Sequence, residues 1–230
     1  MLDKMLYWLT RPSISAYTKL MMDLDIDQSD VLPAGPKILA ANHPSVSDPF
    51  LVILAARQQV HILIAEEVFK VKPFGTYLSR SGHIPVIPGR GQEAIDQALR
   101  LLDQGKTVLI FPEGAISPRG GGFHDPRTGV ARLALASGAP VVPIGLHLEE
   151  QKITELVSRS GDEDVVGYWY LKGPYSITIG APMHYPGDVE NRERVRDVSR
   201  KIMDRIILLA RQSERRMRGI SHLPALPSQV

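Results

Sequence analysis

Short apolar runs alternate with segments of helical length from residue 37 onward, and this alternation limits the chain to folds in which strands and helices follow one another. Each run has the length of a strand, and turn-forming residues bound it. We expect buried strands at residues 38–41, 60–65, 83–87, 107–111 and 140–145. The pattern predicts an α/β fold: a single domain with a mostly parallel or mixed central sheet flanked by helices.

The segments between these strands have the features of helices. Glycines and prolines mark their ends. We expect helices at residues 49–57, 92–102 and 130–136, and a helical segment at 66–81 that is interrupted at Pro73 and Gly75. Further along, the spacing of the apolar residues at 168–171 and 176–179 predicts a hairpin that extends the sheet.

The first 36 residues are predicted to form an N-terminal amphipathic helical segment. Apolar residues recur at helical spacing from Leu2 to Leu9, and a second stretch runs from Ile14 to Leu24 beyond Pro12. One apolar face with basic residues nearby suits either packing against the sheet or a position among lipid headgroups. The pattern favours neither interpretation over the other.

A long basic helix is predicted near the C-terminus. Apolar residues recur at helical spacing from Val195 to Leu209, and we expect this stripe to pack against the sheet. Residues 190–219 hold ten Lys or Arg against five Asp or Glu, although the net charge of the whole chain is only +2. The predicted organisation is an N-terminal segment at 1–36, an α/β domain at 37–219 and a C-terminal tail at 220–230.

Composition excludes several classes of protein. With 230 residues, 43% hydrophobic, the chain can bury one substantial core, and its longest apolar run, 50–56, is far shorter than a membrane span. We expect no membrane-spanning segment and no export, because charged residues interrupt the first residues. There is no cysteine, so disulfides, thiolate metal sites and cysteine nucleophiles are excluded.

A histidine and an aspartate five residues apart follow the first predicted strand. On a regular helix, His43 and Asp48 would point about 140° apart. Pro44 and Pro49 each disfavour helical geometry in the preceding residue, so the segment can fold back and bring the carboxylate to the imidazole. Asp48 followed by Pro49 is also a good helix start, with Asp48 as the N-cap. The pair is therefore a candidate for acid–base chemistry that needs support from elsewhere.

A second polar cluster follows the predicted strand at 107–111. The sequence there is Phe111-Pro112-Glu113-Gly114, at the strand end where open α/β sheets place their sites. The loop that follows contains Arg119, three successive glycines and further basic residues. Glycine-rich basic loops can bind anions, but many surface loops have the same composition and bind nothing.

Four short motifs, taken in order, resemble those of the glycerolipid acyltransferases, the lysophosphatidic acid acyltransferase group. They are His43-x4-Asp48, Gly82-x-Ile-Pro-Val86, Phe111-Pro-Glu-Gly114 and Val142-Pro-Ile144, which together cover about residues 37–146. A joint match in order and spacing is far more specific than any single motif. The resemblance makes 37–219 the acyltransferase domain.

The resemblance implies an O-acyltransferase that moves a fatty acyl group from acyl-CoA or acyl carrier protein to the hydroxyl of a lysophospholipid such as 1-acylglycerol-3-phosphate. His43 would be the general base and Asp48 would orient it, without a covalent intermediate. Phe111, Pro112, Glu113 and Gly114 would bind substrate. No cofactor is expected beyond the acyl donor. We expect a peripheral protein on the cytoplasmic face of the membrane, because the substrates reside in bilayers.

The motifs depart from the family pattern where arginines are expected. The third motif usually continues with Thr-Arg, and here reads Ala115-Ile116, while the second usually ends in an arginine near the position of Pro88. Arg90 and Arg119 lie two to four residues downstream and could bind the acceptor phosphate instead. The departures leave a non-phosphate lipid or glycolipid acceptor as an alternative.

Other functions fit the sequence less well. Gly89-x-Gly91-x-x-Ala94 imitates a dinucleotide fingerprint, with Glu113 as its ribose-binding acid, but prolines interrupt the preceding strand. A His-dependent thioesterase would use the same base to activate water, whereas a serine hydrolase is disfavoured because no G-x-S-x-G occurs. Zinc spacings are absent, and the negative charge outside residues 190–219 argues against nucleic acid.

Overall fold

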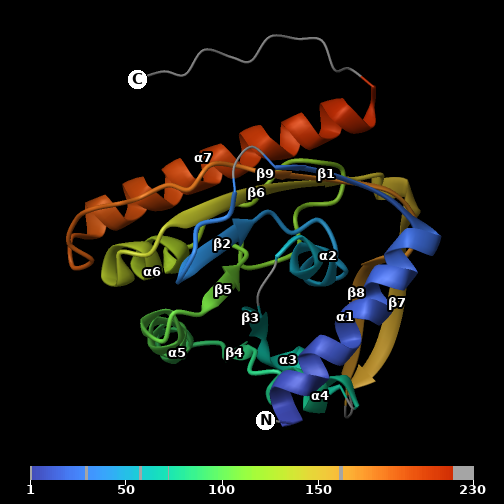
Figure 1. Ribbon diagram of the computed structural model, residues 1–230, viewed down its shortest axis with the longest axis horizontal. Helices are drawn as coiled ribbons and strands as arrows, with labels where there is room; N and C mark the ends of the chain where they lie inside the picture. The colour runs from blue at the N-terminus through green and yellow to red at the C-terminus, as the bar shows by residue number, and fades with distance from the viewer. Residues whose placement is uncertain (1, 29–30, 57–58, 72, 161–162, 220–230) are drawn as a thin grey trace.

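The apolar runs assemble into one seven-stranded mixed sheet (Figure 1). The computed structural model describes residues 2–28, 31–56, 59–71, 73–160 and 163–219. Neighbouring strands run parallel except at the β6–β9 pair, so the prediction of a mostly parallel, mixed sheet is confirmed. In sheet order, the strands are β1 (Met22–Gln28), β9 (Gly173–Ile179), β6 (Val141–Leu148), β2 (Lys37–Ala41), β5 (Thr107–Ile110), β3 (Val60–Ala65) and β4 (Ile84–Val86).

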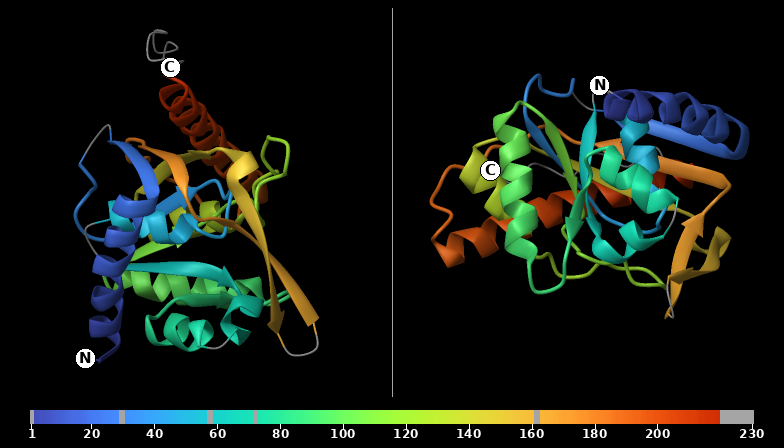
Figure 2. Two further views of the ribbon diagram at one scale, coloured as in Figure 1. Left: turned by 90° about the vertical axis from the view of Figure 1, so that its right-hand side faces the viewer. Right: turned by 90° about the horizontal axis from the view of Figure 1, so that it is seen from below.

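Helices flank the sheet, as the sequence predicts (Figures 1 and 2). The segment expected at 66–81 is broken into two short helices, and Pro73 occupies the N-cap position of the second. The interruption predicted at Gly75 is wrong, because Gly75 lies within the second helix. A short 3-10 turn, Glu150–Lys152, follows β6. In chain order, the helices are α1 (Leu2–Met21), α2 (Asp48–Ala55), α3 (Glu66–Lys70), α4 (Phe74–Arg80), α5 (Gly91–Asp103), α6 (Gly129–Ser137) and α7 (Arg192–Met217).

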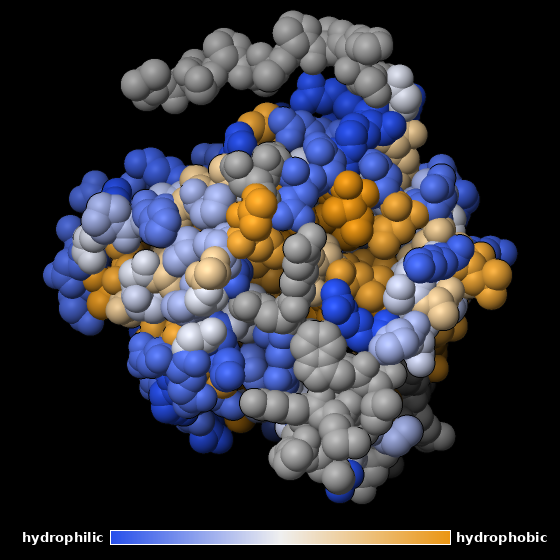
Figure 3. Space-filling model, in the orientation of Figure 1, coloured by the Kyte–Doolittle hydropathy of each residue, from blue (hydrophilic) through white to orange (hydrophobic). Residues whose placement is uncertain are grey.

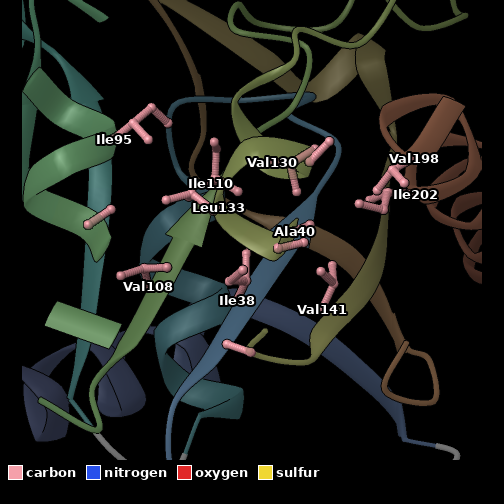
Figure 4. Packing of buried hydrophobic residues seen from close by; sticks show 14 of the residues in the cluster. Ile38, Ala40, Ile95, Val108, Ile110, Val130, Leu133, Val141, Val198 and Ile202 are labelled. Carbon is pink, nitrogen blue, oxygen red and sulfur yellow. The ribbon is translucent and has the colours of Figure 1, made fainter. Parts of the chain in front are cut away.

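The core has two parts, one on each face of the sheet. Successive side chains of a strand point to opposite faces, so Ile38 and Ala40 of β2 join one cluster and Leu39 and Ala41 join the other. Figure 4 shows the first cluster, which residues of α5, α6 and α7 complete. The second cluster contains α2. Burial on both faces explains why β2 reads as a continuous apolar run.

The predicted packing of the long C-terminal helix against the sheet is confirmed. The buried side of α7 includes Val198 and Ile202, which lie in the core cluster of Figure 4. At Gly145 of β6, a Cβ atom would come within 2.0 Å of the Ala210 backbone nitrogen. The missing side chain therefore lets the helix lie directly on the strand.

The N-terminal segment differs from the prediction after residue 21. A single helix, α1, continues through Pro12, and Leu24 lies in β1 instead of a second helix. Residues 22–28 read MDLDIDQ, an alternation of apolar and acidic residues with the period of a strand. β1 pairs in parallel with β9 and so joins the sheet as an edge strand. The predicted tail, 220–230, lies outside the described residues.

The predicted hairpin is wrong in its pairing. The antiparallel hairpin consists of β7 (Ile153–Ser160) and β8 (Glu163–Tyr170), which form a separate two-stranded sheet. Figure 2 shows it extending from the main body. β9 begins only three residues after β8 ends but pairs with β6 and β1. The pairing differs because β8 pairs with β7, the strand just before it in the chain. The buried side chains of β9 instead pack in the main core.

No helix among the described residues has both the length and the apolar character needed to cross a bilayer.

Candidate active site

The residue that follows β2, Asn42, is hydrogen-bonded to the neighbouring strand β6. The side-chain amide of Asn42 donates to the Leu146 carbonyl at 2.9 Å, and its oxygen accepts from the Leu146 amide at 2.7 Å. This pairing continues the β2–β6 contact one residue beyond the strand. It places His43 at the carboxyl end of a central parallel strand, where α/β sheets position functional loops.

His43 and Asp48 are in direct contact. The Nδ1 atom of His43 lies 2.9 Å from Oδ2 of Asp48, whose side chain is 0% exposed. A carboxylate only accepts, so Nδ1 carries the proton and Nε2 of the neutral ring keeps a free lone pair. The folded-back geometry predicted from the two prolines therefore occurs.

Asp48 is held by three further donors. The Ser45 amide donates to Oδ2 at 2.8 Å, and Ser45 Oγ and the Tyr175 hydroxyl donate to Oδ1 at 2.5 and 2.7 Å. Burial raises the pKa of Tyr175 well above its usual value, and the nearby Asp48 charge raises it further, so the phenol remains a donor. The carboxylate is fixed in position and orients the imidazole.

The start of α2 is shifted by one residue from the prediction. The helix begins at Asp48, and Ser47, not Asp48, occupies the N-cap position. Ser47 makes no side-chain cap, because its Oγ accepts from the Tyr170 amide at 3.0 Å. The Asp48 carboxylate is thereby directed to His43 instead of to the helix amides.

Glu113 fixes the backbone around His43. Its side chain is buried, and Oε1 accepts from the His43 amide at 3.0 Å and from Ser117 Oγ at 2.7 Å. Oε2 accepts from the His124 amide at 2.9 Å. In addition, the Ser117 amide donates to the His43 carbonyl at 2.8 Å. Because protein donors occupy both of its oxygens, Glu113 joins the His43 loop to the loop after β5.

Phe111 and Gly114 of the same motif contact different partners. The Phe111 ring stacks on that of His43, with centroids 4.0 Å apart and planes 17° apart. Gly114 has φ +66°, and a Cβ atom there would come within 2.4 Å of Arg127 Nε. The glycine therefore lets the Arg127 side chain pass close to the motif.

A cavity of about 560 Å³ opens beside His43. This volume is in the range of ligand sites in proteins. His43, Phe111, Pro112 and Gly114 line one part of it, whereas Glu113 is not on its wall. Most of the remaining wall is apolar and comes from separate segments of the chain: Phe50, Ile53, Ile62, Leu63, Ile64, Val68, Phe74, Leu78, Val86, Ala94, Ile95 and Ile110.

One corner of the cavity is basic. Arg127 and Arg132 lie on its wall, and neither has a carboxylate within 4.0 Å among the described residues. Arg132 donates to the side-chain oxygen of Gln92. The first residues of α5 and α6, Gly91 and Gly129, line the same corner, and neither helix has a side-chain cap. Uncapped helix N-termini and arginines together form a suitable site for an anion.

The two arginines singled out from the sequence lie away from this wall. Arg90 forms an exposed ion pair with Glu93 at 2.7 Å. Arg119 is exposed and lies over the Tyr168 ring, with its guanidinium carbon 5.4 Å from the centroid. The sequence placed Arg127 in the basic, glycine-rich loop that could bind an anion, but it gave no role to Arg132, because no motif marks that residue. Their position at the start of α6, a glycine-led helix, is the signal that could have identified them.

The described residues contain no group of three or more His, Asp or Glu side chains arranged to hold a metal ion. In a dinucleotide site, Glu113 would have to bind the ribose. Its two oxygens already accept hydrogen bonds from the protein, which conflicts with that role.

A histidine oriented by a buried carboxylate, on the wall of a largely apolar cavity within an open α/β sheet, is an arrangement typical of an enzyme. The family comparison identifies this class. The model of the acyltransferase family matches residues 23–147, slightly more than half of the chain, and the chain therefore belongs to the acyltransferase family. The prediction that the protein is an O-acyltransferase is confirmed.

Among solved structures, the fold is similar to that of the 1-acyl-sn-glycerophosphate (LPA) acyltransferase PlsC from Thermotoga maritima. The similarity has a TM-score of 0.62 and covers 97% of this chain and 81% of that chain, at 17% sequence identity. The shared fold extends beyond the family match to include α7. A search of curated proteins gave no match.

Proposed function

We propose that the protein transfers a fatty acyl group from acyl-CoA or acyl carrier protein to the hydroxyl of a lysophospholipid such as 1-acylglycerol-3-phosphate. The observation that carries this proposal is that His43, held by Asp48, lies on the wall of a cavity that is mostly apolar and basic at one corner. The apolar part suits a hydrocarbon chain, and the basic corner suits a phosphate. PlsC, the structural neighbour, is named for an acceptor of the same kind, 1-acyl-sn-glycerophosphate.

In the proposed reaction, the acceptor hydroxyl gives its proton to Nε2 of His43 as its oxygen attacks the thioester carbonyl. The tetrahedral intermediate then expels the thiolate, which takes the proton back from the imidazolium. Asp48 stabilises the positive charge that His43 carries between these steps. An ester bond forms as the thioester bond breaks, and no bond to the enzyme is required.

Phe111 and Glu113 act differently in this scheme. The stacked Phe111 ring limits rotation of the imidazole, and Glu113 fixes the backbone amide of the same histidine. We therefore assign Glu113 as a positioning residue. Pro112 and Gly114 remain on the cavity wall as substrate-binding positions.

The proposed phosphate site consists of Arg127, Arg132 and the N-termini of α5 and α6. Charge-assisted hydrogen bonds to phosphate contribute about 1.5–3 kcal/mol each, so losing one arginine should raise the KM for 1-acylglycerol-3-phosphate about 10- to 100-fold. Arg90→Ala and Arg119→Ala serve as matched controls, because these exposed arginines lie off the cavity wall. If the control variants raised the KM more, Arg90 and Arg119 would be the residues that bind the phosphate.

An acceptor panel tests the whole proposal. Purified protein and palmitoyl-CoA are incubated with 1-acylglycerol-3-phosphate, an uncharged monoacylglycerol, a glycolipid acceptor, or no acceptor. The proposal predicts acyl ester formation that is fastest with the phosphate-bearing acceptor. Faster transfer to an uncharged or glycolipid acceptor would identify the alternative acceptor class. Release of free fatty acid at the same rate without acceptor would identify a thioesterase.

The proposed substrates reside in bilayers, which supports a position of the protein at a membrane surface. The C-terminal part of α1 exposes Tyr17, Leu20 and Met21, and Leu20 is 83% exposed. Beside them, a hollow of about 670 Å³ between α1 and β1 has Arg11 and Lys19 among its lining residues. Exposed apolar residues next to basic ones suit the headgroup region of a bilayer. We propose peripheral binding to the cytoplasmic face of the membrane through this surface.

A further inference from the structure

The apolar part of the cavity contains a buried histidine that the proposed reaction does not use. His83 immediately precedes β4, is 4% exposed and lines the cavity. Its Nδ1 atom accepts a hydrogen bond from the Ile62 amide at 3.2 Å. The backbone of β3 thus fixes the ring in one orientation.

The opposite nitrogen of this ring is a donor without an acceptor. Because Nδ1 accepts a hydrogen bond, the neutral ring carries its proton on Nε2. Within the described parts of the chain, no residue accepts a hydrogen bond from His83 Nε2. Burial, together with the nearby His61, lowers the pKa of His83 to about 4, so the ring is neutral under physiological conditions. A neutral donor therefore remains available at the cavity wall.

The surroundings of His83 make this donor unusual. Ile62 and Leu78, whose backbones hydrogen-bond to His83, line the cavity, as does Tyr77, whose ring centroid lies 6.5 Å from that of His83. An unpaired donor in such a wall is unfavourable, and cavities of this kind usually hold a group that accepts the hydrogen bond.

His83 also lies far from the reacting groups. The sheet order places β5 and β3 between β2 and β4, so three strand spacings of about 4.8 Å separate the two histidine-bearing segments by about 14 Å. A chain whose carbonyl lies at His43 would reach His83 only with carbons remote from that carbonyl.

We propose that His83 Nε2 donates a hydrogen bond to an oxygen on a bound fatty acyl chain, so that the cavity accepts chains hydroxylated away from their carbonyl end. The inference rests on the proposed function, because it assumes that an acyl chain fills the cavity. The hydroxylated chain belongs either to the acyl donor or to the lysolipid acceptor.

Equilibrium binding of each substrate alone tests this proposal without requiring turnover. Palmitoyl-CoA and 1-palmitoylglycerol-3-phosphate are compared with analogues hydroxylated next to the carbonyl, at mid-chain or near the methyl end. We expect a mid-chain or methyl-end hydroxyl to tighten binding at least 10-fold over the analogue hydroxylated next to the carbonyl. The substrate that shows this gain, donor or acceptor, identifies which chain reaches His83.

Two variants assign the effect to the ring nitrogen. His83→Leu should abolish the preference for the hydroxylated chain, and His83→Gln, which keeps an N–H near the Nε2 position, should restore part of it. His61→Leu is the matched control, because His61 is buried nearby but does not line the cavity. Thermal unfolding of each variant confirms that it is folded.

The outcomes separate this inference from the proposed function. If no hydroxylated substrate binds more tightly, or if the preference survives in His83→Leu, the inference is wrong and His83 holds only water. A separate turnover assay with unsubstituted palmitoyl-CoA tests the acyltransferase function. Absence of turnover would contradict the proposed function, whereas the binding assay alone decides the role of His83.

Discussion

Tyr175 does not line the cavity, but it contacts the carboxylate that holds His43. Its hydroxyl donates to the Asp48 oxygen that does not contact the imidazole. Tyr175→Phe removes one of the donors that fix this carboxylate, so we expect kcat to fall about 10-fold while both KM values change little. Steady-state kinetics measures the split between kcat and KM.

Tyr170→Phe is the control for this substitution. Tyr170 is an equally buried neighbour, with its ring centroid 5.8 Å from that of Tyr175, but its hydroxyl donates to the Pro174 carbonyl instead of to Asp48. An equal loss of kcat in both variants would show that the effect is general packing damage.

His83 predicts a pH dependence of stability. Its pKa falls from 6.5 in an exposed residue to about 4 in the fold, so between these values the unfolded chain binds the extra proton. Stability is complete above pH 6.5 and is lost as pH falls toward 4, by up to about 3 kcal/mol. Urea unfolding at several pH values should show this loss in the native chain and a smaller loss in His83→Leu. Equal pH slopes for the two proteins would contradict the assignment.

At single residues, the sequence predicted the contact but not its surroundings. The His43–Asp48 contact follows from two prolines that forbid a regular helix, which is a local effect. The Tyr175 hydrogen bond joins residues 127 positions apart, and no local pattern encodes it. The same holds for Arg127 and Arg132, whose neighbours at the cavity, Gly114 and Gln92, are distant in the sequence.

Among the elements, Arg216 of α7 adds side-chain contacts to the paired strands β1 and β9. Arg216 donates to Asp25 at 2.8 Å, to the Thr178 and Ser176 hydroxyls at 2.7 and 2.9 Å, and to the Ile177 carbonyl at 2.9 Å. Its side chain is 24% exposed. These contacts tie the edge strand, its neighbour β9 and the C-terminal helix together.

Removing this arginine should loosen the edge of the sheet. For Arg216→Ala we expect a loss of about 2–4 kcal/mol in the free energy of unfolding, because several charge-assisted hydrogen bonds disappear at once. Amide hydrogen exchange should rise in residues 22–28 more than in β2. Arg211→Ala, an exposed arginine on the same helix, should cost under about 0.5 kcal/mol. Unchanged exchange in 22–28 would show that β1 is held by backbone pairing alone.

The elements that were predicted well are those with uniform apolar runs. β2, β3 and β5 lie at the centre of the sheet, and burial on both faces requires such runs. β1 was missed because its alternating aspartates follow a strand period within a stretch interpreted as helical. The pairing of β9 was missed because strand partners are chosen by packing across the whole chain.

At the scale of the whole molecule, α1 carries the test of membrane binding. Leu20→Glu places a charge at the most exposed apolar position among the side chains described for this helix, those of residues 11–21. Deleting the N-terminal segment, residues 1–36, would also remove β1. We expect sedimentation with anionic liposomes to fall at least 3-fold, because a buried leucine contributes about 1.5–3 kcal/mol and the charge opposes insertion.

Leu156→Glu is the control for this prediction, since Leu156 is an exposed apolar residue on the β7–β8 hairpin. Figure 3 shows apolar side chains gathered on the face that includes the β1 edge, below the hydrophilic surface of α7. If Leu156→Glu weakens sedimentation and Leu20→Glu does not, the membrane contact belongs to the hairpin.

The overall architecture was predictable because the order of strands and helices restricts the possible folds. The cavity was not, because its wall combines residues from α2, β3, α4, β5 and α6 that are far apart in the sequence. Its shape therefore depends on the relative placement of the elements, which local periodicity does not encode.

In the proposed function, His43 removes the proton from the acceptor hydroxyl during acyl transfer. The most direct measurement is the rate of labelled palmitoyl transfer from CoA to 1-acylglycerol-3-phosphate, with both substrates saturating, by the native chain, by His43→Ala and by His184→Ala, which replaces an exposed histidine. We predict a loss of about 10²- to 10⁴-fold in His43→Ala and a nearly unchanged rate in His184→Ala. A folded His43→Ala variant that transfers palmitoyl at the native rate would contradict the claim.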